Sequence, residues 1–121
     1  MLLRKTTFIL IALTAFGCSN DSPDDLGVEA IPTDIPITYN ANVTAIIDNN
    51  CISCHNIVPQ NGAPMSLATF EDVKNAIELR GLIERISRDN GQSGLMPLGG
   101  PKMPQQNIDI ITLWRDQGFK Q

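Results

Sequence analysis

Two thiols and an imidazole lie within five residues of one another, at Cys51, Cys54 and His55. The pattern Cys-x-x-Cys-His is the attachment signature of a c-type haem, in which both thiols bond covalently to the haem vinyl groups and the imidazole binds the iron. Three residues apart on a helical turn, the two sulfurs reach one edge of the porphyrin, and His55 turns under the ring. The motif therefore predicts one covalent haem c, bonded to Cys51 and Cys54, with His55 as an axial ligand.

Two other uses of a Cys-x-x-Cys pair are half of a zinc site and a redox-active dithiol. Structural zinc takes four ligands, whereas the chain has three cysteines and one histidine, and the neighbours Cys54 and His55 are badly placed to bind one tetrahedral ion together. A thioredoxin-like dithiol would need a βαβ pattern around it, and the sequence contains none. Haem attachment is therefore the preferred interpretation.

The N-terminus predicts export. Arg4 and Lys5 precede a short apolar run, so residues 1–17 are typical of a signal peptide and are too short for a membrane span. The pair Gly17-Cys18 resembles the lipobox of bacterial lipoproteins, which implies cleavage before Cys18 and lipid on that residue. The alternative is an ordinary secreted protein with an unpaired Cys18. Haem is attached to c-type proteins outside the cytoplasm, so the two motifs support each other.

The charge of the chain is unevenly divided. Residues 18–37 contain five acids, no base and three prolines, a composition that favours an extended tether. Residues 38–121 contain eight acids and seven bases, giving −1. No basic surface for nucleic acid is indicated. The predicted organisation is a signal peptide (1–17), an acidic tether (18–37) and a small folded domain (38–121).

The folded domain reads as helical. Val43, Ile46, Ile47, Cys51 and Cys54 share one face of a helix, which Asn40 or Asn42 would cap. Further helices are expected after the capping box of Thr69 and Asp72, around Leu82–Ile86, and from about Gln105 to Gln117, where Gly118 would end it. A loop rich in glycine and proline is expected over 89–104. No strand is expected.

The order of these features resembles the class I cytochrome c fold. The order is the Cys-Ile-Ser-Cys-His motif, the helices, Leu-Met-Pro-Leu-Gly-Gly-Pro at 95–101 and a final helix with Trp114. The closest resemblance is to small monohaem cytochrome c domains of bacterial lipoproteins. It implies an all-α fold around one covalent haem, with the first helix (Val43, Ile46, Ile47) crossing the last (Ile108, Ile111, Trp114).

The resemblance also implies the remaining site residues. Met96 precedes Pro97 and matches the Met-Pro position of the sixth iron ligand, while Met103, which precedes Pro104, is the alternative. A metal-bound histidine usually donates its second N–H to a backbone carbonyl, and here the candidate is Pro64, with Pro59 second. The cations that could pair with the haem propionates are Arg80, Arg85, Arg88 and Lys102, although such residues are more often a solvated face.

These residues predict a membrane-tethered carrier of single electrons. Redox partner proteins would dock weakly near an exposed haem edge, no small-molecule substrate is expected, and no catalytic residue is assigned. The alternative is a haem enzyme or a gas or redox sensor with an open sixth iron site, although the lack of a second histidine weighs against a peroxidase. A non-haem lipoprotein is a third option. The expected location is outside the cytoplasm on a bacterial membrane, with the outer membrane favoured by Ser19 after the lipidated cysteine.

Overall fold

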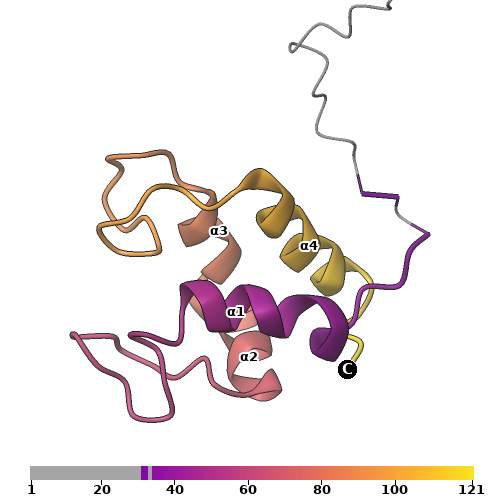
Figure 1. Ribbon diagram of the computed structural model, residues 1–121, viewed down its shortest axis with the longest axis horizontal. Helices are drawn as coiled ribbons and strands as arrows, with labels where there is room; N and C mark the ends of the chain where they lie inside the picture. The colour runs from indigo at the N-terminus through magenta and orange to yellow at the C-terminus, as the bar shows by residue number, and fades with distance from the viewer. Residues whose placement is uncertain (1–30, 33) are drawn as a thin grey trace, which may run out of the picture.

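The structure is a computed structural model that describes residues 31–32 and 34–121. Over these residues the chain forms helices and no β-strand, which confirms the all-α class expected from the sequence. The elements in chain order are η2 (Tyr39–Val43), α1 (Thr44–Asn50), α2 (Phe70–Arg80), α3 (Leu82–Ser87) and α4 (Gln105–Asp116) (Figure 1). The predicted signal peptide, Cys18 and most of the predicted tether lie outside the described residues.

The N-terminal helix begins with the single π-helical turn η2 and continues directly into α1 (Figure 1). Its cap is Thr38, whose hydroxyl accepts a hydrogen bond from the backbone N–H of Ala41 at 3.2 Å. A second hydrogen bond joins the same turn, in which Oδ1 of Asn42 accepts from the backbone N–H of Thr38 at 3.0 Å. The prediction of Asn40 or Asn42 as the cap is therefore wrong, although Asn42 takes part in the capping.

The α1 helix ends at Asn50, so the prediction of a helix running on through Cys54 is wrong. Cys51 has φ −122°, outside the helical range, and the backbone N–H of Ile52 bonds five residues back to the carbonyl of Ile47 at 3.3 Å. The Asn50 side chain donates to the carbonyl of Ile46 at 2.7 Å, which satisfies one acceptor of the last turn. The cysteine motif therefore lies in turns that follow the helix.

The two middle helices follow the sequence closely. Thr69 and Asp72 form the expected capping box at the start of α2, with reciprocal hydrogen bonds of 3.1 and 3.2 Å. Gly81 ends α2 with φ +67°, a left-handed conformation that glycine adopts without a steric penalty, and the chain turns there into α3. This α3 is the short helix predicted around Leu82–Ile86, and Leu82 and Ile86 are buried in it.

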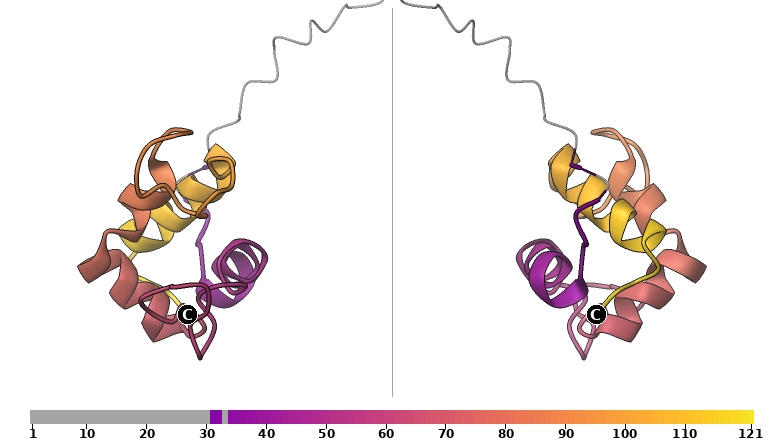
Figure 2. Two further views of the ribbon diagram at one scale, coloured as in Figure 1. Left: turned by 90° about the vertical axis from the view of Figure 1, so that its left-hand side faces the viewer. Right: turned by 90° about the vertical axis from the view of Figure 1, so that its right-hand side faces the viewer.

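The last helix, α4, buries Ile108, Ile111 and Trp114, close to the predicted face. It packs against η2 and α3, so the expected crossing of the first and last helices is made by the η2 part of the N-terminal helix. Figure 2 shows α4 and the N-terminal helix from both ends of the molecule. Among the described helices, none is long and apolar enough to cross a membrane.

Four aromatic rings pack together where η2, α2 and α4 meet. We call this set the aromatic cluster: Tyr39, Phe70, Trp114 and Phe119. Trp114 contacts the other three rings at centroid distances of 4.9 to 5.5 Å, and two of these contacts are edge-to-face, which is a preferred geometry for aromatic pairs. The indole N–H of Trp114 and the backbone N–H of Tyr39 both donate to the carbonyl of Lys120, at 2.7 and 2.8 Å. The cluster therefore joins the start and the end of the domain.

The chain enters the domain beside the aromatic cluster, at the C-terminal end of α4 (Figure 1). The Gln117 side chain accepts from the backbone N–H of Ile37 at 2.8 Å and donates to the carbonyl of Ile35 at 2.9 Å. Ile37 is buried in the core. The residue at the end of the predicted tether is therefore part of the folded domain.

Candidate functional site

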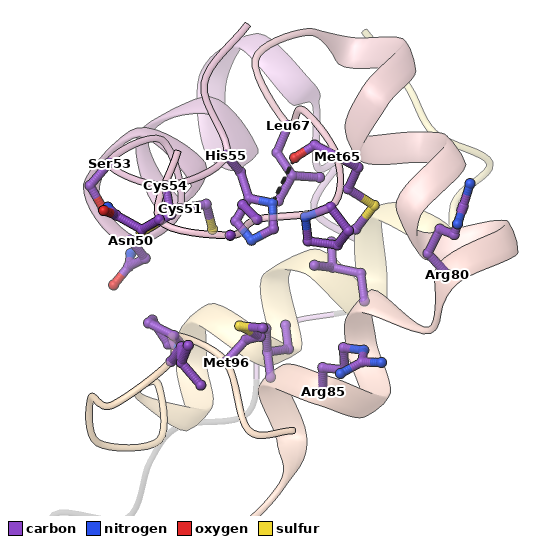
Figure 3. Close-up of a pocket in the computed structure, with 18 of the residues that line it drawn as sticks. Asn50, Cys51, Ser53, Cys54, His55, Met65, Leu67, Arg80, Arg85 and Met96 are labelled. Carbon is purple, nitrogen blue, oxygen red and sulfur yellow. Dashed lines mark hydrogen bonds between the residues drawn. The ribbon is translucent and has the colours of Figure 1, made fainter. Parts of the chain in front are cut away.

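The site is a cavity of about 420 Å³, a size found for cofactor and small-molecule pockets. Its walls come from four stretches, within residues 50–55, 61–67, 80–86 and 96–103. These are the loop after α1, the adjoining ends of α2 and α3, and the loop before α4, which gather at the end of the molecule away from the chain entry (Figures 1 and 3). The Cys-x-x-Cys-His motif and the Met-Pro loop, far apart in the sequence, therefore share one cavity.

His55 is fixed at this cavity by three hydrogen bonds. Its backbone N–H donates to the carbonyl of Cys51 at 2.8 Å, and its own carbonyl accepts from the backbone N–H of Leu67 at 2.8 Å. Its ring Nδ1 lies 2.8 Å from the carbonyl oxygen of Met65. Because a carbonyl only accepts hydrogen bonds, Nδ1 carries the proton, and Nε2 of the neutral ring keeps a free lone pair.

The Nε2 atom of His55 faces the cavity (Figure 3) and makes no hydrogen bond to any described residue. The side chain is otherwise buried, with 9% exposure. An imidazole held through Nδ1 with its other nitrogen turned into a cavity is the arrangement that proteins use for a metal ligand. The geometry therefore suits His55 for binding a metal centre inside this cavity.

The carbonyl that holds His55 belongs to Met65, so the predictions of Pro64 and of Pro59 are wrong. The loop turns at residues 60–63, where the backbone N–H of Ala63 bonds to the carbonyl of Gln60 at 2.9 Å. The bond from Leu67 to the carbonyl of His55 then draws the chain alongside the imidazole. This path turns the carbonyl of residue 65 toward the ring, while Pro64 is one of the residues that line the cavity.

Cys51 and Cys54 line the same side of the cavity as His55 (Figure 3), and both are free thiols. The turn that carries them is closed by the backbone N–H of Cys54 bonding to the carbonyl of Cys51 at 3.1 Å. Burial raises the pKa of Cys51 to about 11, whereas reactive dithiols have lowered pKa values. The surroundings of Cys51 therefore do not favour the redox-dithiol interpretation.

The zinc interpretation also finds no support in the described part of the chain. Residues 31–32 and 34–121 contain no group of three or more His, Cys, Asp and Glu side chains placed to hold one metal ion. A structural zinc site needs four such ligands.

Three thioethers line the cavity, those of Met65, Met96 and Met103. Met96 lies across the cavity from His55 (Figure 3) and is half-buried. Its backbone N–H donates to the carbonyl of Arg85 at 3.1 Å, which attaches the Met-Pro loop to α3. Met103 is more deeply buried, with 4% exposure, and packs in the hydrophobic core. The side chain of Met65 is partly buried and packs against the core as well.

The four candidate cations separate into two pairs. Arg80 and Arg85 line the cavity on the side away from the thiols (Figure 3). Arg88 instead pairs with Glu84 at 2.7 Å, and Lys102 pairs with Asp89 at 3.3 Å. Neither Arg88 nor Lys102 is among the residues that line the cavity.

Several cavity residues were not identified from the sequence as part of a site. The lining also includes Asn50, Ser53, Asn61, Leu67, Leu82, Ile86 and Leu98. Leu82 and Ile86 belong to the predicted short helix, and their apolar spacing does not say which space they face. Asn61 has φ +51° and donates to the sulfur of Cys54 at 3.5 Å. The Asn-Gly pair at 61–62 signals a turn, which was the available clue to Asn61.

Comparison of this chain with protein-family models, with curated proteins and with solved structures found no match. The functional argument therefore depends on the cavity and on the motifs in the sequence. The donor set fits a haem c. Two thiols lie on one side of the cavity, a free imidazole nitrogen points into it, a thioether lies opposite, and the remaining wall is mainly aliphatic.

Proposed function

We propose that this protein is a monohaem c-type cytochrome that carries single electrons between redox partner proteins outside the cytoplasm. The observation that carries the proposal is the orientation of His55, whose Nδ1 is held by the carbonyl of Met65 while Nε2 faces Met96 across the cavity (Figure 3). In the proposal, Cys51 and Cys54 form the thioethers, and His55 and Met96 bind the iron, with Met103 as the alternative to Met96.

The two sides of the cavity support this arrangement. In haem, the vinyl groups and the propionates lie on opposite edges of the macrocycle. The thiols of Cys51 and Cys54 lie on one side of the cavity, and Arg80 and Arg85 lie on the other (Figure 3). Guanidinium groups form strong paired hydrogen bonds with carboxylates. Haem bonded at the thiols would thus direct its propionates toward the two arginines.

The pair of axial ligands decides between the electron carrier and the alternative with an open iron site. When bound, haem supplies an iron that cycles between the ferric and ferrous states, and ligation by His and Met gives it a raised potential. A neutral, soft thioether at the sixth position favours ferrous iron. Met96 faces the imidazole and is attached to α3 through its backbone, which favours the closed site of a carrier over an enzyme or a sensor.

The finer description of the fold belongs to the same proposal. The helices would wrap around one haem, which fills the cavity. A domain of this size has only a small core of its own, and the walls of a cavity of about 420 Å³ would gain apolar contacts from a group that fills it. The haem would therefore be a structural part of the protein.

The anchoring proposal depends on residues outside the described range. Cleavage of the signal peptide would leave Cys18 as a lipidated N-terminus, and the acidic tether would connect it to the domain. The protein would then be attached to a bacterial membrane, with the outer membrane favoured, and would face the periplasm or the cell surface. Acylation of the mature N-terminal peptide, measured by mass spectrometry, tests this part independently of the haem.

The decisive experiment for the haem site combines covalent attachment with ligand substitution. Haem should stay with the polypeptide in acidified organic solvent, and ferric protein should show the weak thioether-to-iron charge-transfer absorption. Met96→Leu, which conserves volume, should abolish this absorption, lower the potential and admit carbon monoxide or cyanide. Met103→Leu is the matched control and should retain the wild-type spectrum.

Each contrary outcome has a definite meaning. Haem that is extracted into the solvent contradicts the covalent attachment. Loss of the absorption in Met103→Leu alone would transfer the ligand role to Met103. A wild type that already binds carbon monoxide readily, with neither variant changing the spectrum, would replace the electron carrier with the open-site haem protein.

A further inference from the structure

The loop that carries Met96 is fastened to α3 at two points close to the thioether. The first is the hydrogen bond from the backbone N–H of Met96 to the carbonyl of Arg85, at 3.1 Å. The second is the guanidinium of Arg88, whose Nη1 donates to the carbonyl of Ser93. Both partners on the loop lie within four residues of one another, so the short segment 93–96 is held at each end.

Arg88 is itself held in place by Glu84, one helical turn earlier. Nη2 of Arg88 donates to Oε1 of Glu84 at 2.7 Å, while Nη1 reaches Ser93. The hydrogen bond from Arg88 lowers the pKa of Glu84, so this carboxylate is ionised at neutral pH. A planar guanidinium offers donors in two fixed directions, whereas a lysine ammonium is a compact point charge on a flexible stem. The contact therefore uses a property specific to arginine.

Gly94 leaves the space that this contact needs. It has φ +79°, and a Cβ on its backbone would overlap with Nη1 of Arg88 and would come within 3.1 Å of Nη1 of Arg85. The guanidinium of Arg88 thus lies directly against the loop backbone, two residues before Met96. A side chain at position 94 would displace the guanidinium and strain the backbone.

We propose that Arg88, oriented by Glu84, is a positioning residue that holds the 93–96 segment so that the thioether of Met96 stays at the iron. The inference deepens the proposed function and depends on it. Arg88 does not line the cavity, and it acts through its hydrogen bond to the carbonyl of Ser93. Its loss frees one end of the segment, which favours states in which Met96 has left the iron.

The test uses the full holoprotein and titrates the ferric form with imidazole, which competes with the thioether. Arg88→Gln removes the positive charge and the guanidinium. Arg88→Lys keeps the charge but loses the planar guanidinium that donates in two fixed directions. One hydrogen bond from a partly exposed charged group contributes about 1 kcal/mol, so each variant should bind imidazole about fivefold more tightly than the wild type. The thioether charge-transfer absorption should weaken in parallel.

The matched control is Arg115→Gln. Arg115 is also an exposed arginine paired with an acid, Asp116 at 2.8 Å, but it lies on α4 away from the Met-Pro loop. It should leave the imidazole affinity unchanged. Denaturant unfolding of all three variants separates a general loss of stability from a local effect, because a purely structural role would lower the unfolding midpoint without changing imidazole binding in the folded protein.

The outcomes distinguish this inference from the proposed function. If the wild type shows the thioether absorption but both Arg88 variants bind imidazole with the affinity of Arg115→Gln, the positioning role is refuted while the haem ligands stand. A wild type without that absorption refutes the Met96 ligand and the positioning role together. Gly94→Ala gives a second measure, since it should displace the guanidinium and raise imidazole affinity with Arg88 still present.

Discussion

The two ends of this domain differ in how completely their own side chains fill the interior. At the chain entry, the aromatic cluster packs ring against ring, and Trp114 is completely buried. At the other end, two cysteines, a histidine and three methionines surround an open space of about 420 Å³. None of the described aromatic residues lines that space. The comparison teaches that one end is filled by its own side chains, whereas the other encloses the cavity in which the proposed haem would lie.

The largest expected effect comes from removing the attachment of that group. The double variant Cys51→Ala/Cys54→Ala should lose covalent haem, and the domain should be largely unfolded. The reason is that about 84 residues cannot support a void of this size with one small core. Far-ultraviolet circular dichroism and haem absorption after acid extraction measure the two losses.

The control for the cysteine variant is Cys18→Ala, which removes only the proposed lipid site. It should keep the haem spectrum and the helical signal while releasing the protein from the membrane fraction. If the double variant kept a cooperative, fully helical fold, the cavity end would be stable without its group, and the contrast between the two ends would fail.

A smaller effect is expected at the aromatic end. Trp114→Ala should lower the free energy of unfolding by about 3–5 kcal/mol, because it leaves a cavity in a closed core. Trp114→Phe should have a smaller effect, since it keeps a ring and loses mainly the hydrogen bond to the carbonyl of Lys120. Urea unfolding of the holoprotein measures both differences.

In the Trp114 variants the thioether absorption of the folded fraction should stay as in the wild type, because the indole does not line the cavity. Loss of that absorption in a variant that is still folded would show that the two ends are coupled, and would contradict their separation.

The smallest effect is expected at Asp72, in the segment that connects the cavity end to the aromatic cluster. Asp72 lies on α2, two residues after Phe70 of the aromatic cluster, and accepts from the hydroxyl of Ser66 at 2.9 Å, next to the Met65 that holds His55. Burial raises the pKa of Asp72, but hydrogen bonds from Ser66 and Thr69 outweigh it, and the net pKa is lowered. Asp72→Asn should lower the free energy of unfolding by about 1 kcal/mol at neutral pH, as expected for a weakened helix cap.

The pH dependence follows from the sign of this shift. A carboxylate with a lowered folded-state pKa stabilises the protein fully above its unfolded pKa, about 3.9, and this contribution is lost as the pH falls through the lower folded-state value. Denaturant unfolding at pH 7 and near pH 3 should therefore show a smaller acid-induced loss in Asp72→Asn than in the wild type. An equal loss in the two proteins would show that Asp72 contributes no such stabilisation.

The sequence was sufficient where local chemistry decides the structure. The capping box of Thr69 and Asp72 and the apolar spacing of Ile108, Ile111 and Trp114 correctly predicted α2 and α4, and the helix expected around Leu82–Ile86 is α3. The cavity also gathers the residues that the sequence singled out for it, namely Cys51, Cys54, His55, Met96 and Met103.

Where a result depends on contacts between distant segments, the sequence was insufficient. The apolar periodicity continues past Asn50, but the turn that carries the cysteines ends the helix there. The path of the loop from Gln60 to Leu67 decides which carbonyl accepts the hydrogen bond from Nδ1 of His55. It is the carbonyl of Met65 and not that of Pro64. The fastening of the Met-Pro loop by Arg88 depends on the fold of residues 93–96 against α3, and charge alone did not distinguish Arg88 from Arg80 or Arg85.

The side-chain amide of Gln117 has a mechanical consequence. The amide forms two hydrogen bonds with the backbone of the segment that enters the domain, at Ile35 and Ile37. The carbonyl of Lys120 nearby accepts from the backbone N–H of Tyr39. A pull on the chain ahead of these residues is thus borne by the end of α4, and it bypasses the loops around the cavity, which lie at the opposite end of the molecule (Figure 1). If the proposed tether anchors the domain to a membrane, a pull on the chain would act on the end that holds the aromatic cluster, and the loops around the cavity would not carry it.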